Sequence, residues 1–215
     1  MKTLLFTTLA TLFSPLPLQA EAEKPRKIVL VHGFLNSSVH FGFMKKRFEN
    51  RGFECYAPDL RPCDARCGLE KLALQLKQDI DTRYGRDQKI ILIGYSMGGI
   101  VSRYYLQNLD GAKRCEKFIT ISSPHNGTVM ARLYPSQGAR EMRRHSEFLK
   151  QLATSESQLG KIPVVSYHTP MDLMILPATS SVWNRAENIS YPILAHPLML
   201  YSNRVIEDIA EKLEK

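Results

Sequence analysis

Six short runs rich in β-branched and aromatic residues alternate with longer stretches of helical periodicity, and this alternation restricts the fold more than any other feature. The runs cover residues 27–33, 53–58, 89–95, 117–123, 162–168 and 188–194. The stretches with an apolar face at helical spacing cover residues 41–51, 68–84, 98–109 and 201–214. Strands that alternate with helices form parallel sheets, and continuous apolar strands are buried on both faces. The sequence therefore predicts an α/β fold with a mostly parallel central sheet and helices on both faces.

The first 22 residues have the pattern of a secretory signal peptide. One basic residue precedes an apolar stretch over residues 4–13, and small residues follow at Ala20 and Ala22. We expect cleavage after Ala20 or Ala22. A membrane anchor is the alternative, but this stretch and all later ones are shorter than the roughly 20 apolar residues that span a bilayer. The expected product is an exported protein, periplasmic or extracellular, with residues 23–215 as a single domain.

The chain is basic, with a formal net charge of +8 and concentrations of Lys and Arg at residues 45–47 and 140–144. No helix-turn-helix, zinc-finger or RNA-binding signature accompanies this charge, so nucleic acid is not an expected partner. Two interpretations stay open. The charge forms either an ordinary solvated surface or a site of peripheral contact with anionic lipid or acidic glycans.

The four cysteines are Cys55, Cys63, Cys67 and Cys115. An exported protein permits disulfides, and four cysteines allow three connectivities. Because Cys63 and Cys67 share one short loop, we favour a local bridge between them, with Cys55 and Cys115 either paired or free. A metal site is disfavoured, since no histidine lies near that loop and the spacing does not match that of zinc ligands. We expect no bound metal.

The segment GYSMGG, residues 94–99, joins the third apolar run to a helical stretch and matches the pattern G-x-S-x-G. A serine in such a sharp strand-to-helix turn projects its hydroxyl above the sheet, and the crowded backbone requires glycine at Gly94 and Gly98. The following helix also directs its dipole at any oxyanion formed on an attacked carbonyl. We therefore predict that Ser96 is a nucleophile in a nucleophile elbow.

A serine hydroxyl becomes reactive when a histidine, oriented by a carboxylate, takes its proton. After a turn of this kind, the acid and then the histidine follow along the chain. Asp172 lies in the loop after the fifth apolar run, and His196 is the one histidine that comes later. We predict that Asp172 orients His196 as the general base. His125 is the rival base because it also follows a strand, and we interpret it as a loop-shaping residue near the pocket.

The first apolar run ends in His32-Gly33-Phe34. A turn at this point directs the backbone amide of Phe34 into the site, where it joins the amide of Met97. We predict that these two N–H groups form an oxyanion hole. The reaction expected from these residues needs no organic cofactor.

Together these motifs resemble the small bacterial lipases and esterases of the α/β-hydrolase superfamily. The resemblance extends over residues 26–212 and is carried by HGF at 32–34, GYSMGG at 94–99, SSPHNGT at 122–128, the Asp172 loop and His196. It implies an α/β-hydrolase fold and a single catalytic domain that hydrolyses carboxylic esters through an acyl-enzyme. Because the interval 124–161 has room for one or two helices, we expect a minimal cap or none. The expected substrate is an ester or lipid, and we expect a monomer.

The resemblance also implies that segment 138–152 borders an acyl groove. Ten apolar residues are candidates for its lining, with core packing as the alternative for each: Phe34, Leu35, Met130, Leu133, Met171, Leu173, Met174, Ile175, Leu198 and Met199.

Two other functions stay open. The same triad could serve an acyltransferase or thioesterase, because an acyl-enzyme can pass its acyl group to other acceptors. A binding or chaperone-like module on an inactive hydrolase fold is disfavoured by the complete set of three residues in order. Glycosylation motifs at Asn36 and Asn126 would place glycans beside the expected site, and a third lies at Asn188; this favours a bacterial host that leaves them bare.

Overall fold

A computed structural model describes residues 25–214, so the expected signal peptide over residues 1–22 lies outside the described residues. All six apolar runs form strands: β1 (Lys27–Val31), β2 (Glu54–Tyr56), β3 (Ile90–Tyr95), β4 (Cys115–Ile121), β5 (Val164–His168) and β6 (Glu187–Ser190). They form one sheet in the order β2-β1-β3-β4-β5-β6, and every neighbouring pair is parallel. The predicted parallel α/β sheet is confirmed.

The four expected helices are present, and two shorter ones accompany them. The helices are α1 (Gly42–Glu49), α2 (Leu69–Tyr84), α3 (Met97–Asn108), α4 (Gln137–Glu141), α5 (Glu147–Thr154) and α6 (Asn203–Glu214). Short 3-10 segments are η1 (Ser38–Phe41), η2 (Gly111–Arg114), η3 (Val129–Leu133), η4 (Glu156–Leu159), η5 (Ala178–Ser181) and η6 (His196–Leu200). None of the helices between residues 25 and 214 is both long and apolar enough to cross a bilayer.

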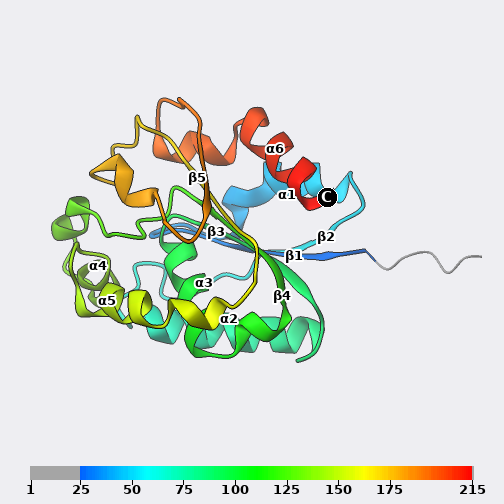
Figure 1. Ribbon diagram of the computed structural model, residues 1–215, viewed down its shortest axis with the longest axis horizontal. Coiled ribbons are helices and arrows are strands. Elements are labelled where there is room, and N and C mark those ends of the chain that lie inside the picture. The colour runs from blue at the N-terminus through cyan, green and yellow to red at the C-terminus, as the bar shows by residue number, and fades with distance from the viewer. Residues whose placement is uncertain (1–24, 215) are drawn as a thin grey trace, which may run out of the picture.

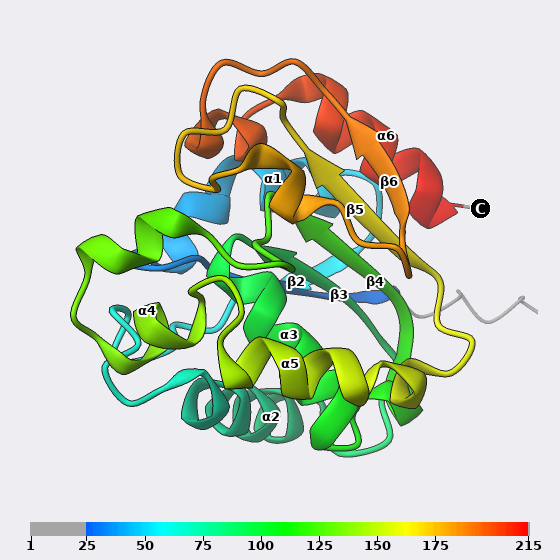
Figure 2. The same cartoon turned by 60° about the vertical axis from the view of Figure 1, so that its left-hand side comes forward.

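Helices cover both faces of the sheet because its central strands are apolar on both sides. Along β1, Ile28 and Leu30 point to the core that α1 and α6 cover, whereas Val29 and Val31 point to the core under α2 and α3. Figures 1 and 2 show these two layers, with α1 and α6 above the sheet and α2 and α3 below it. This alternation follows from the period of two along a strand.

All strands are parallel, so their carboxyl ends meet at one edge of the sheet, where ligands bind in folds of this kind. The interval between β4 and β5 contains η3, two short helices, α4 and α5, and η4. Figure 2 shows α5 lying beside α3 on the lower face, with α4 next to it at the loop side. This agrees with the expected small cap.

The disulfide expectation is not borne out, since all four cysteines of the structure are free thiols. Cys55 and Cys115 lie on β2 and β4, which β1 and β3 separate. Three strand spacings amount to about 14 Å, twice the largest Cα separation of about 7 Å that a disulfide spans. In the loop before α2, the Cys67 thiol donates to the Gly68 carbonyl oxygen at 3.6 Å and is not bonded to Cys63.

Candidate active site

Ser96 occupies the sharp turn between β3 and α3. Its backbone has φ 53° and ψ −125°, a conformation that residues other than glycine adopt only under strain. The Ser96 N–H donates to the carbonyl oxygen of Ile121 on β4 at 2.8 Å, which fixes the turn against the neighbouring strand. The serine side chain therefore stands at the carboxyl edge of the sheet, at the N-terminus of α3.

The glycines on either side of Ser96 are required by close backbone contacts. A Cβ atom on Gly98 would lie 2.1 Å from the carbonyl oxygen of Val31, and one on Gly94 would lie 2.5 Å from the Cα of Gly99. No larger residue fits at either position without moving β1 or the first turn of α3. The crowding expected from the sequence motif is present at both glycines.

The structure brings Asp172 and His196 into direct contact. Nδ1 of His196 donates to Oδ2 of Asp172 at 2.7 Å, and both side chains are buried. The second carboxylate oxygen, Oδ1, accepts the backbone N–H groups of Met174 at 2.9 Å and Ile175 at 2.8 Å. Three donors thus fix the carboxylate, and the imidazole keeps Nε2 as its unprotonated nitrogen in the neutral form.

The pKa of Asp172 lies below its usual value. Burial acts to raise this pKa, but the hydrogen bond and the charge of His196, together with the amides of Ile175 and Met174, outweigh burial. The carboxylate is therefore ionised at neutral pH and can stabilise a positive charge on the neighbouring imidazole.

His196 begins η6 and packs against the strand that carries the serine. Its ring lies 5.0 Å from the ring of Tyr95, measured between centroids, and Tyr95 directly precedes Ser96. Tyr95 and His196 thus meet at the carboxyl edge of the sheet, whereas no hydrogen bond joins the Ser96 hydroxyl to His196 within residues 25–214. Ser96, Asp172 and His196 come from the loops after β3, β5 and β6.

The loop after β1 passes directly beside Ser96. A Cβ atom on Gly33 would lie 3.0 Å from the Cβ of Ser96. His32, which is buried, fixes this loop, because its Nδ1 donates to the Gly33 carbonyl oxygen at 2.9 Å and its Nε2 accepts the Leu60 N–H at 2.9 Å. Burial lowers the pKa of His32, so the ring is neutral and can act as donor and acceptor at once. The sequence does not predict this contact.

The two predicted oxyanion donors, the backbone N–H groups of Phe34 and Met97, lie next to the contact between the loop after β1 and Ser96. The Leu35 N–H donates to the Cys63 carbonyl oxygen at 2.8 Å, whereas the Phe34 N–H has no acceptor within residues 25–214. Met97 is the first residue of α3, so its N–H has no intrahelical partner. Both amides are therefore available to an oxygen atom near Ser96.

Comparisons with known proteins agree with this architecture. Residues 27–194 match a family model described as the alpha/beta hydrolase fold. The chain belongs to the α/β-hydrolase family. Mature Bacillus licheniformis lipase BlEst2 is similar to this chain with a TM-score of 0.72 and 19% identity, over 92% of this chain and 95% of the lipase.

Two further solved structures show how widely this fold is used. Aspergillus fumigatus lipase B has a TM-score of 0.77 at 15% identity, over 89% of this chain and 53% of the lipase. A bromoperoxidase from Bacillus anthracis has a TM-score of 0.71 at 13% identity, over 89% of this chain and 92% of the bromoperoxidase. At these identities the likeness concerns the fold of this α/β hydrolase alone.

An apolar groove opens at Ser96. Besides the serine it is lined by Phe34, Pro124, Thr128, Met130, Ala131, Tyr134, Ala139, Met142, Met174 and Ile175. Four of the ten expected lining residues are among them, and segment 138–152 contributes Ala139 and Met142. Met199 is buried in the core, and the other five expected residues, Leu35, Leu133, Met171, Leu173 and Leu198, are exposed around the groove. The groove is small, about 50 Å³, and its apolar lining suits a short hydrocarbon segment next to the serine.

The rival histidine, His125, lies in a different environment. Thr120 donates its hydroxyl to Ser166 at 3.0 Å, so the Thr120 oxygen accepts Nε2–H of His125 at 3.0 Å. Nδ1 of His125 then accepts from Nη1 of Arg103 at 3.4 Å. Both ring nitrogens are occupied, and burial, followed by the charge of Arg103, holds the pKa of His125 well below its usual value. Neither ring nitrogen of His125 is therefore free to accept a proton from Ser96.

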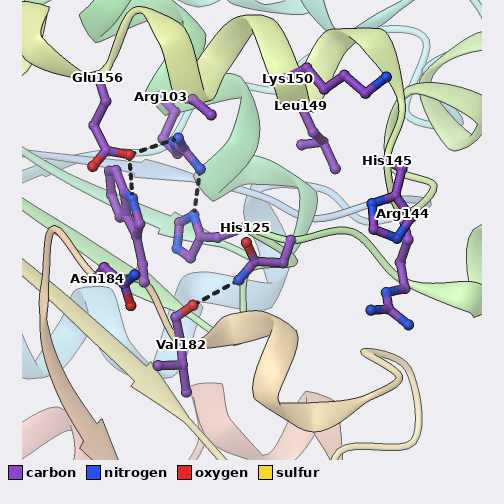
Figure 3. Close-up of a pocket in the computed structure, with 12 residues that line it drawn as sticks. Arg103, His125, Arg144, His145, Leu149, Lys150, Glu156, Val182 and Asn184 are labelled. Atoms are coloured by element: carbon purple, nitrogen blue, oxygen red, sulfur yellow. Dashed lines mark hydrogen bonds and ion pairs between the residues drawn. The ribbon is translucent and has the colours of Figure 1, made fainter.

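The hydrogen bonds of His125 and Arg103 face a cleft of about 500 Å³, which we call the second cleft (Figure 3). Arg103 points at His125 and Glu156, with its guanidinium 4.2 Å from the ring centroid of Trp183 and 3.4 Å from the Glu156 carboxylate. Burial lowers the pKa of Arg103 to about 10, against the opposing effect of Glu156. This arrangement is a satisfied polar network that ties α3, the loop after β4 and η4 together.

The part of the chain that the structure describes, residues 25–214, brings no three His, Cys, Asp or Glu side chains close enough to hold a metal ion.

Proposed function

We propose that this α/β hydrolase cleaves carboxylic esters through an acyl-enzyme. Ser96 is the nucleophile, His196 the general base and acid, and Asp172 the residue that orients the imidazole. The backbone amides of Phe34 and Met97 bind the oxyanion. The observation that carries the proposal is the buried hydrogen bond of 2.7 Å between His196 and Asp172, held beside the strained turn of Ser96.

In the first half-reaction, Nε2 of His196 takes the hydroxyl proton of Ser96 while Oγ forms a bond to the ester carbonyl carbon. The carbonyl oxygen becomes an anion and accepts hydrogen bonds from the amides of Phe34 and Met97. When the bond to the alcohol oxygen breaks, the imidazolium returns its proton to that oxygen. Water then repeats the sequence on the acyl-enzyme and releases the carboxylic acid and free Ser96.

The groove at Ser96 supports a substrate with an apolar acyl chain. Its lining is almost entirely hydrocarbon and sulfur, and no charged side chain contributes to it. The pattern of residues 1–22 supports export, so we also propose that the enzyme acts in the periplasm or outside a bacterial cell.

Nitrophenyl esters of increasing acyl length test the proposal. We expect Ser96→Ala to lower kcat by about 10⁴-fold or more and to abolish labelling by an organophosphonate. Ser157→Ala removes an exposed serine and serves as the control. If the Ser96→Ala variant cleaves these esters and is labelled as the parent is, the proposed nucleophile is wrong.

The base is tested separately. We expect His196→Ala to lose activity as Ser96→Ala does and His125→Ala to keep most of it, after correction for the folded fraction. The reverse result would assign the base to His125. A product analysis with glycerol present completes the test, because acyl transfer in excess of hydrolysis would make the protein an acyltransferase.

A further inference from the structure

Large hydrophobic side chains are exposed almost entirely at one edge of the molecule. Among the described residues, 13 such side chains are exposed, and 12 of them lie within residues 35–43, 129–134, 171–174 and 194–201. These four segments follow β1, β4, β5 and β6, and we call their exposed apolar side chains the apolar rim. The remaining one is Leu74 on α2. Scattered exposed apolar residues are normal, but a concentration of this kind marks an interaction surface.

The segments of the apolar rim are joined to one another. The ring of Phe34, which precedes the first segment, lies 4.9 Å from the ring of Tyr134 in the second. The Thr128 hydroxyl donates to the Met174 carbonyl oxygen at 2.9 Å and so ties the second segment to the third. The same two contacts border the groove at Ser96.

Two more contacts close the circle. The Thr169 hydroxyl donates to the Ile193 carbonyl oxygen at 2.6 Å and joins the third segment to the fourth. The ring of Tyr201 lies 6.4 Å from that of Phe43, which returns the fourth segment to the first. The four segments that carry the apolar rim are therefore linked in a circle, and Tyr134 and Met174 of the rim line the groove at Ser96.

The outermost side chains of the rim are too exposed to serve as groove lining. Val39 is 81% exposed, Leu133 69% and Leu194 71%, and none of them lines the groove. Their apolar surface is covered only when something approaches this edge of the molecule.

Positive charge accompanies the rim. Arg132 lies within η3 between two exposed apolar residues, and Nε–H of Arg143 donates to the carbonyl oxygen of Ala131 in the same segment at 3.5 Å. The whole chain has a formal charge of +8. Cationic side chains beside an apolar ring fit a layer of anionic headgroups over hydrocarbon, whereas they would repel the same face of a second copy.

We propose that the apolar rim docks on the surface of a lipid layer with anionic headgroups. The rim side chains enter the boundary between headgroups and acyl chains, and the arginines lie at the level of the phosphates. The groove then faces the layer, so the ester passes from lipid to Ser96 without crossing water. This inference rests on the proposed function for its consequence, but docking itself is measurable without catalysis.

Docking is tested with Ser96→Ala protein, which leaves lipid uncleaved, in sedimentation with vesicles of phosphatidylcholine alone or mixed with phosphatidylglycerol. We expect binding to the mixed vesicles that weakens as salt is raised. Adding Val39→Glu and Leu133→Glu should reduce this binding about tenfold or more, since both charges would enter the apolar boundary. Adding Leu74→Glu instead, on α2 and outside the apolar rim, should leave vesicle binding unchanged.

Three results would overturn the proposal. One is vesicle binding that is equal with and without Val39→Glu and Leu133→Glu. Another is equal binding to vesicles of phosphatidylcholine alone, which would show that binding does not require an anionic headgroup. The third is a dimer in solution that these two substitutions dissociate, which would make the rim a contact between copies.

The catalytic and docking proposals fail in different ways. With Ser96 intact, the Val39→Glu, Leu133→Glu variant should cleave a soluble short-chain ester at the parent rate and lose activity only on vesicle-borne ester. Absence of cleavage of the soluble ester by the parent contradicts the proposed function. Parent activity on soluble ester without vesicle binding contradicts the docking proposal alone.

Discussion

The imidazole of His196 and the carboxylate of Asp172 form a buried hydrogen bond of 2.7 Å, although 24 positions separate the two residues. The carboxylate is held in turn by the amides of Met174 and Ile175. In the proposed mechanism this arrangement keeps the imidazole in one tautomer and stabilises its positive charge when it takes the serine proton.

Replacing the orienting acid tests this relationship. We expect Asp172→Asn to lower kcat by about 10³- to 10⁴-fold with little change in KM, because an amide donor at this position favours the wrong imidazole tautomer. Steady-state kinetics with a soluble nitrophenyl ester measures the effect. Asp110→Asn, which removes an exposed carboxylate beyond the end of α3, should behave as the parent. Equal kinetics for both variants would exclude Asp172 from the triad.

The stability of the fold should depend on pH through its buried histidines. Burial and Arg103 depress the pKa of His125, so between that low value and the ordinary value of about 6.5 the unfolded chain binds a proton that the folded protein does not. Stability therefore falls as the pH drops below about 6.5, by up to about 1.4 kcal/mol per pH unit for this one group.

Denaturant unfolding between pH 7 and pH 5 measures this dependence. We expect His125→Gln to have a flatter pH profile than the parent, even if the substitution lowers stability at every pH. His145→Gln, at an exposed position in the second cleft, is the control and should keep the parent slope. A parent slope in the His125→Gln variant would contradict the prediction.

The nucleophile elbow provides a paired test at two glycines. Gly98→Ala places a Cβ 2.1 Å from the Val31 carbonyl oxygen, so β1 or α3 must shift, and we expect a loss of about 1–3 kcal/mol in stability together with loss of activity. Gly42→Ala, at the first residue of α1, meets nothing within 4 Å and should be neutral or slightly stabilising. Thermal unfolding of both variants compares them, and equal effects would show that the elbow tolerates a methyl group.

Features that depend on local sequence were predictable. The six strands follow from runs of β-branched residues, and the positions of Ser96, Asp172 and His196 follow from one motif and from chain order. The contact between Asp172 and His196 then requires only that parallel strands share a carboxyl edge. The predicted contact is present in the structure, while the catalytic roles remain predictions.

Features that depend on strand order and side-chain packing were not predictable. The sheet order separates Cys55 from Cys115, and no local pattern specifies that order. The network of Arg103 with His125 and Trp183 was also missed. The sequence does contain one indication of this network, because Arg103 is the single charged residue of α3. A charged side chain on a buried helix needs a hydrogen-bonding or ionic partner.

The apolar groove predicts which acyl chains the proposed ester hydrolase accepts. Ala139 on α4 is buried in the groove wall, so the larger side chain of Ala139→Leu would occupy space that an acyl chain needs. Each methylene excluded from the groove costs about 0.8 kcal/mol, or about fourfold in kcat/KM. We expect activity on an acetate ester to persist while the ratio of butyrate to acetate activity falls about tenfold, because butyrate is longer by two methylenes. Ala153→Leu, on the exposed side of α5, should leave this ratio unchanged, and a uniform loss across all chain lengths would place the acyl chain elsewhere.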